Sequence, residues 1–155
     1  MNTVIDTLAE ILQHRAYVKA NLDQIRAELE QLGDLHDLSK LDEEEFDAFC
    51  STREDFKRAN YGDALYKKCT ERIKSAVERH YKLNRHHTGY HENGFADMDL
   101  IDILEMLADW KAASRRSPLL SFEDSLPKAF EMHNIPENMQ KHILATLKRL
   151  GWISQ

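Results

Sequence analysis

The sequence has few of the residues that interrupt helices, with five glycines and three prolines among 155 residues. It also lacks any useful stretch in which apolar and polar residues alternate, which is the pattern of a half-buried strand. Apolar residues instead recur at intervals of three and four along the chain. These absences argue against a sheet-based fold and predict one all-α domain over residues 1–155.

Cysteine is scarce as well, and long apolar runs are missing. Cys50 and Cys69 lack the close spacing of a thiolate metal site, and we expect both to be reduced thiols. No apolar run approaches the roughly 18 residues that a membrane helix needs. The first fifteen residues show no basic segment followed by an apolar one, so they do not resemble a signal peptide. We therefore expect a cytoplasmic protein without a membrane partner.

The chain has no excess of positive charge, because its formal net charge is −6 with histidine neutral. General nucleic-acid binders usually show a basic balance or a basic patch, and we do not expect that class of partner. A small nucleotide bound beside a metal ion stays compatible with this charge, because the cation changes the local electrostatics.

The apolar periodicity predicts five to seven helices in one bundle. The first is expected over 3–32, as one long helix or as two with a kink, with Gly33 as its stop. The second is expected to begin at Asp42, with Asp42 as N-cap and Glu45 completing a capping box. Further helices are predicted over 63–85, 98–113, 122–132 and 136–150.

Two polar sites lie on or beside the apolar face of the first predicted helix. His14 shares that face with Ile11 and Val18, and the dipeptide His36-Asp37 follows the predicted helix stop. Taken singly, His14 is more simply a core histidine, and His36-Asp37 is more simply a capped turn.

Histidines gather at the end of the helix predicted over 63–85. His80 lies on the apolar face of that helix, and His86 and His87 follow it closely. Asp109 lies in a largely apolar helical run, where a buried carboxylate needs a partner. A metal ion or a salt bridge to lysine or arginine would serve equally well there.

Considered together, these residues favour a metal site more than each does alone. Neutral imidazoles and carboxylates suit one or two divalent ions of the Mn, Fe, Co, Ni or Zn group, and no thiolate is recruited. A mixed set of this kind is typical of an open catalytic site rather than a structural zinc site. The candidate ligands are His14, His36, Asp37, His80, His86, His87 and Asp109.

The order of these residues resembles the signature of the HD-domain superfamily of metal-dependent phosphohydrolases, H…HD…D. The matching residues are His14, His36-Asp37 and Asp109, and "HDLSK" at 36–40 is similar to the HD-x-G-K form of one branch. The resemblance covers about residues 10–115 and is closest to an uncharacterised bacterial and phage HD-like family. Residues 116–155 are expected to form a C-terminal helical extension.

The resemblance implies an all-helical phosphohydrolase that acts on a nucleotide or a related small phosphate ester or anhydride. A divalent ion would activate water for attack on phosphorus, and Asp37 would ligate the ion and orient that water. Lys40 would contact substrate phosphate. Arg15 follows a candidate ligand and is a second candidate phosphate contact, with a solvated helix residue as the alternative.

Several alternatives stay open at this point. Arg115 and Arg116 could clamp a phosphate, although a surface pair at a helix end is the simpler interpretation. Trp110 is favoured as a core residue over one that stacks on a base. Which of His80, His86, His87 and His91 bind metal is not determined, and a homo-oligomer is compatible with the sequence. A di-iron oxygenase or a non-catalytic metal- or nucleotide-binding module would use the same residue types.

Overall fold

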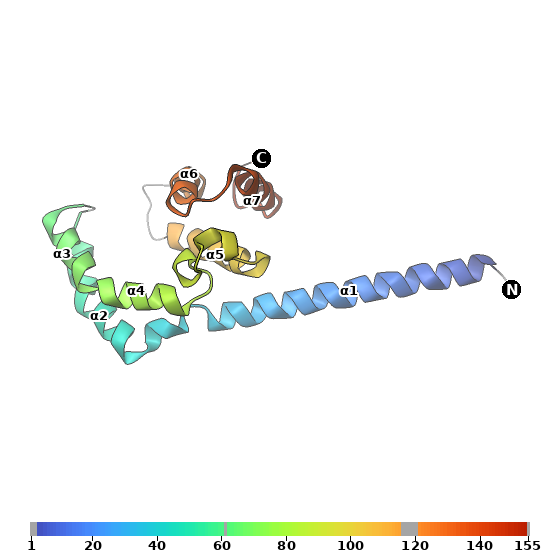
Figure 1. Ribbon diagram of the computed structural model, residues 1–155, viewed down its shortest axis with the longest axis horizontal. Helices are drawn as coiled ribbons and strands as arrows, with labels where there is room; N and C mark the ends of the chain where they lie inside the picture. The colour runs from blue at the N-terminus through green and yellow to red at the C-terminus, as the bar shows by residue number, and fades with distance from the viewer. Residues whose placement is uncertain (1–2, 61, 116–120, 155) are drawn as a thin grey trace. The chain divides into compact units, whose positions relative to one another are not determined.

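The computed structural model describes residues 3–60, 62–115 and 121–154. These ranges hold seven α-helices and three short 3-10 helices and no strand, so the predicted all-α class with five to seven helices is confirmed (Figure 1). The chain divides into two units, residues 1–36 and residues 37–155, and each is described by itself. That the two form a single HD-like domain stays a prediction.

The first unit is one helix, α1 (Thr3–Leu35). It continues through Gly33, so the predicted helix stop at this glycine is wrong. The left-handed residue that follows the helix is Asp37, with φ of 59°. None of the residues of α1 is buried. Among the described residues, no helix is both long enough and apolar enough to cross a bilayer.

The second unit begins with η1 (Leu38–Leu41) and α2 (Glu43–Arg58). Asp42 is the N-cap residue of α2, as predicted, but its side chain makes no capping hydrogen bond. Its carboxylate instead accepts a hydrogen bond from Arg79, at 3.1 Å. The capping box predicted for Asp42 and Glu45 is therefore wrong, and Glu45 is left for a different role.

The helix predicted over 63–85 is two helices in the structure, α3 (Ala64–Arg72) and α4 (Lys74–Leu83). The break falls at Ile73, whose ψ of 1° lies outside the helical range. The side chain of Asp63 caps α3 by accepting from the backbone N–H of Tyr66. Because of the break, α4 is a short helix that ends just before the segment rich in histidine.

The loop predicted over 86–98 contains two short turns, η2 (Thr88–Tyr90) and η3 (Gly94–Asp97). The next helix, α5 (Leu100–Ser114), starts at a complete capping box formed by Asp99 and Asp102. It is followed by α6 (Phe122–Met132) and α7 (Glu137–Arg149). Gly151 lies just beyond α7 with φ of 67°, the left-handed conformation that is typical of a glycine at the end of a helix.

One apolar core joins η3, α5, α6 and α7. Seven of its twelve buried members follow residue 120, so α6 and α7 belong to this core together with the helix that carries Asp109. Its members are Phe95, Met98, Ile103, Met106, Leu107, Phe122, Leu126, Phe130, Ile135, Ile143, Leu147 and Ile153.

Candidate metal centre

Helix α5 carries an acidic stripe beside its apolar one. Asp102, Glu105 and Asp109 follow one another at intervals of three and four, which places them on one side of the helix. The apolar stripe of Ile103, Met106 and Leu107 faces the core. One side of α5 is thus anchored by packing while the other presents carboxylates in a fixed row.

Residues 85–87, which follow α4, interact with this acidic row. Arg85 donates to both carboxylate oxygens of Asp102, at 2.9 and 2.8 Å. His86 Nδ1 lies 3.1 Å from Glu105 Oε1. The charge of Asp109 acts on His87, where it opposes a lowering of the pKa. Consecutive residues of the segment therefore face successive acids of the helix, which sets the direction of both histidine rings.

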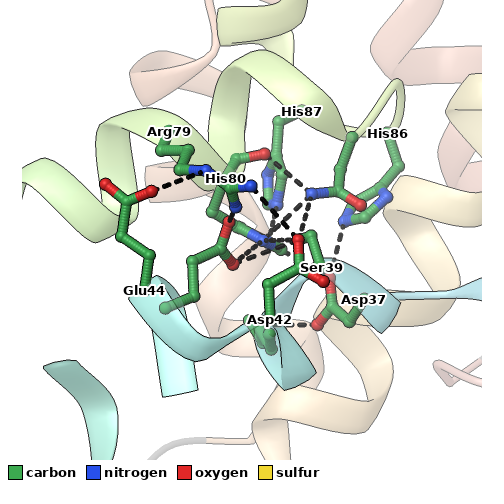
Figure 2. A network of polar contacts seen from close by, with 11 residues as sticks. Asp37, Ser39, Asp42, Glu44, Arg79, His80, His86 and His87 are labelled. Atoms are coloured by element: carbon green, nitrogen blue, oxygen red, sulfur yellow. Dashed lines mark hydrogen bonds and ion pairs between the residues drawn. The ribbon is translucent and has the colours of Figure 1, made fainter. Parts of the chain in front are cut away.

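Four side chains converge beside this row (Figure 2). Asp37 Oδ1 lies 3.1 Å from His80 Nε2 and 3.5 Å from His86 Nε2. His87 Nε2 lies 2.9 Å from His80 Nε2. One donor atom from each of Asp37, His80, His86 and His87 lies within 4.8 Å of the others. His80 and His86 are each 2% exposed, whereas Asp37 and His87 are only partly buried.

The ring nitrogens that point away from the cluster are held by carboxylates. His80 Nδ1 lies 3.2 Å from Glu45 Oε2, and His86 Nδ1 lies 3.1 Å from Glu105 Oε1. A histidine that ligates a metal usually donates its other ring N–H to a carboxylate, a carbonyl or a water, which fixes its tautomer and orientation. Two of the three histidines have this outer support.

Glu45 is itself tightly held, although it is completely buried. Its Oε1 accepts a hydrogen bond from Arg79 Nη1 at 2.6 Å, and its Oε2 accepts one from Ser39 Oγ at 3.1 Å. Hydrogen bonds to Asp42 and Glu45 raise the pKa of Arg79 above its usual value. The guanidinium is thus the charged partner of the buried carboxylate beside His80.

His80 has several polar partners. Its Nδ1 lies 3.0 Å from both Ser39 Oγ and Asn84 Nδ2 and 3.2 Å from Glu45 Oε2. Its Nε2 lies 2.9 Å from His87 Nε2 and 3.1 Å from Asp37 Oδ1. The ring is therefore held on both sides, and its Nε2 faces the other members of the cluster.

The donor set fits a divalent metal ion. Two ligands that are each about 2.1 Å from one ion lie about 3.0–3.4 Å apart in octahedral or tetrahedral geometry. The three separations in the cluster, 2.9, 3.1 and 3.5 Å, fall in or next to that range. His80, His86, His87 and Asp37 could thus hold one ion, and Asp109 has an oxygen within 4.8 Å of a ligand atom of Asp37.

The electrostatics of the cluster favour neutral imidazole at His87. Burial lowers its pKa to about 3, with further lowering by His86 and His80, while Asp109 and Asp37 oppose the shift. Only a neutral imidazole offers a lone pair to a metal. At neutral pH His87 is therefore available as a ligand without losing a proton first.

Asp37 and Lys40 form a local unit at the edge of the cluster. Asp37 has a left-handed backbone, which costs a residue with a side chain about 1 kcal/mol or more. Lys40 Nζ donates to Asp37 Oδ2, the oxygen that does not face the histidines. The unusual backbone and the lysine together direct Oδ1 toward His80 and His86.

Several predicted site residues are not among these four side chains. His14 and Arg15 are exposed on α1, where His14 lies about 30 Å along the helix from Leu35 at about 1.5 Å per residue. His36 is the last residue of the first unit. Arg115 is exposed at the end of α5, and Arg116 lies outside the described residues. That His14 and His36 ligate a metal, and that Arg15 and Arg115 bind phosphate, stay predictions.

His91 and Asp102 have partners away from the cluster. His91 Nε2 donates to the backbone oxygen of Arg85 at 2.8 Å and lies 3.6 Å from Asp102. Asp102 completes a capping box and binds Arg85, so the salt bridge accounts for its burial. Within the described residues, neither belongs to a group that could hold a metal ion.

Glu45, Glu105 and Arg79 take part in the site without having been predicted. Glu45 had been assigned to capping because it stands three residues after a good N-cap residue. Glu105 could have been predicted from the sequence, because it lies four residues before Asp109 on the same side of an apolar helix. Arg79 gave none, because its role depends on tertiary contacts with α2.

Comparison with known proteins identifies a family but no activity. The model of DUF5662, a family of unknown function, matches residues 3–150. No curated protein and no solved structure matches the chain significantly.

Proposed function

The chain belongs to DUF5662, and we propose that it is a metal-dependent phosphohydrolase acting on a nucleotide or a related small phosphate ester or anhydride. One observation carries the proposal. Asp37 Oδ1 and the Nε2 atoms of three histidines converge in a partly buried cluster, while the outer nitrogens of two of these histidines lie against carboxylates.

The donor types favour an ion of the Mn, Fe, Co, Ni or Zn group, because they combine imidazole and carboxylate without thiolate. Such an ion supplies Lewis acidity and lowers the pKa of a water molecule, which are the two effects that phosphoester hydrolysis needs. His80, His86, His87 and Asp37 would hold it. Asp109 is available for a second ion, with an oxygen within 4.8 Å of a ligand atom of Asp37.

The residues around the ion have roles of their own in this proposal. Lys40 brings a positive charge to the outer oxygen of Asp37, and an ammonium group in that place neutralises charge on a phosphate. Asp37 is the residue shared by the histidines and Lys40, so it links metal binding to phosphate binding. Glu45 and Glu105 keep the His80 and His86 rings oriented.

The resemblance of the sequence to HD-domain phosphohydrolases supports the same reaction class. Its signature residues Asp37 and Asp109 come from different elements and have ligand atoms near each other in the second unit. The histidines that such proteins add for further metals correspond here to His80, His86 and His87.

The proposal is tested by measuring phosphate release from a nucleotide panel. The purified chain is incubated with mono-, di- and triphosphates and a cyclic dinucleotide, in parallel with Mn²⁺, Co²⁺, Ni²⁺ and Mg²⁺. We expect activity with at least one metal. Asp37→Ala and His80→Ala should reduce it by at least about a hundredfold, as expected for direct ligands. His142→Ala is the matched control, because His142 is exposed on α7.

Metal analysis of the same samples separates the alternatives. A chain that binds metal through His80 but hydrolyses none of the panel would overturn the hydrolase and favour a non-catalytic module. Bound iron with a spectrum that depends on O₂ would favour the di-iron oxygenase. A chain that binds no metal, and whose stability is unaffected by Asp37→Ala, would overturn all three.

A further inference from the structure

A cavity of about 390 Å³ lies between α5 and α6, and the metal cluster does not use it. Its wall is mostly apolar and includes Trp110 and Ala113 from α5 and Ala129 and Met132 from α6. Its polar members are Ser114, Ser125, Lys128 and His133. This volume is within the range of small-molecule sites, which are commonly apolar pockets with a few polar groups.

Two aromatic rings form one wall of this cavity. The indole of Trp110 and the imidazole of His133 are 5.1 Å apart between centroids, with planes inclined by 31°. His133 is held in place because its Nδ1 lies 3.0 Å from Thr88 Oγ1. A fixed aromatic surface of this kind favours a planar ring, since stacking on aromatic side chains stabilises bases regardless of their sequence.

Residues of the aromatic wall and of the metal cluster are neighbours in the sequence at two places. Trp110 directly follows Asp109, and Thr88, the partner of His133, directly follows His87. Neighbouring Cα atoms are about 3.8 Å apart. Consecutive helical residues point about 100° apart, so Asp109 and Trp110 face adjacent sides of α5 rather than opposite ones. The cavity and the cluster therefore share helix α5 and the segment 87–88.

We propose that the cavity between α5 and α6 binds the purine or pyrimidine base of a nucleotide. The inference deepens the proposed function and rests on it for the position of the phosphate. It names the substrate class, because a sugar phosphate or an inorganic phosphate would leave the aromatic wall uncovered. The base is predicted to stack on Trp110 and to exclude water from the apolar lining.

Intrinsic fluorescence gives a direct test, because the chain has two tryptophans. Trp152→Phe leaves Trp110 as the sole reporter, and Trp110→Phe leaves Trp152, which packs at the edge of the core. Adenosine, which has no phosphate, is titrated with excitation at the red edge of indole absorption. We expect saturable quenching in Trp152→Phe and none in Trp110→Phe. Absence of quenching in Trp152→Phe, or equal quenching in both, overturns the proposal.

A cavity-filling pair sharpens the test. Ala129→Leu adds bulk to the cavity wall, while Ala145→Leu makes the same change at an exposed position of α7. Ala129→Leu should weaken adenosine binding by about tenfold or more. Ala145→Leu should leave it unchanged, and both should bind Mn²⁺ as the unmodified chain does. Unchanged adenosine binding in a folded Ala129→Leu variant would contradict this cavity as the site.

The two proposals fail in different ways. Adenosine binding at Trp110 without hydrolysis of any nucleotide keeps the base site and overturns the hydrolase. Hydrolysis that is equally fast for nucleotides and for glycerol phosphate, with no fluorescence response, keeps the hydrolase and overturns the base site.

Discussion

Glu45 controls the orientation of the His80 ring, and its effect should be visible in metal affinity. Its carboxylate lies 3.2 Å from His80 Nδ1 and accepts from Arg79 at 2.6 Å while completely buried. Glu45→Gln keeps the size of the side chain but removes the charge that holds the ring. We expect metal affinity to fall by about 10- to 100-fold, as for other residues that orient a ligand histidine.

Glu44 provides the matched control for this change. It stands beside Glu45 on α2 and also contacts Arg79, at 3.2 Å, but its side chain is 68% exposed. When metal affinity is measured by competition with a chelating dye, Glu44→Gln should bind the metal as tightly as the unmodified chain does. Equal affinity in Glu45→Gln would mean that His80 does not ligate the metal, or needs no support from Glu45.

His87 and His133 should make the metal-free protein sensitive to mild acid. Burial lowers the pKa of both, to about 3 for His87, from an ordinary value near 6.5. Below pH 6.5 these two imidazoles bind protons in the unfolded chain but stay neutral to lower pH in the folded chain. The free energy of unfolding is therefore highest above pH 6.5 and falls as the pH drops, by up to about 1.4 kcal/mol per pH unit for each histidine.

Urea unfolding in the presence of a chelator measures this dependence. Midpoints between pH 7.5 and 5 avoid most of the titration of ordinary carboxylates. Replacing His133 by Gln should reduce the slope, whereas His142→Gln, at an exposed position, should not. A midpoint that stays constant over this interval would contradict the lowered pKa values.

At the scale of the helix, the sequence predicted those features that depend on residues close together in the chain. The N-cap position at Asp42, the end of α7 at Gly151 and the span 122–132 all follow from residues within a few positions of one another. The break at Ile73 could not be predicted in this way. Neither proline nor glycine marks it, and the residues on both sides favour helix.

The candidate site shows the same division between local and tertiary causes. His80, His86, His87 and Asp37 were selected because such residues are unusual beside apolar faces. Glu45 was missed because a residue in the first turn of a helix has a simpler local explanation. Its burial comes from α4, which supplies both Arg79 and His80 from more than thirty residues away. Contacts at that separation leave no periodic trace in the sequence.

The role of α7 in the core can be tested with one leucine. Leu147 is completely buried in the cluster shared with α5 and α6. Leu147→Ala should lower the free energy of unfolding by about 2–5 kcal/mol, because it leaves a cavity in a packed core. Leu150→Ala, three residues later and 50% exposed, should change it by about 0.5 kcal/mol or less. Similar urea midpoints for the two variants would show that α7 does not contribute to the stability of the core.

At the scale of the whole chain, the two units differ in what supports them. The unit of residues 37–155 has an apolar core and a buried polar cluster, whereas α1 buries none of its residues. The four residues whose donor atoms converge, Asp37, His80, His86 and His87, all belong to the larger unit.

The larger unit alone should therefore fold and bind one divalent ion. Residues 37–155, produced as a separate protein, are expected to unfold cooperatively. Metal at a hundred times its Kd should stabilise them by about 2.7 kcal/mol. Calorimetry of the full chain carrying His14→Ala and His36→Ala gives an independent measure, since that variant retains α1. An affinity within about tenfold of the unmodified chain in both proteins supports a site confined to the larger unit. A large loss in the folded double variant would instead place His14 or His36 among the ligands, as the H…HD…D order of the sequence predicts.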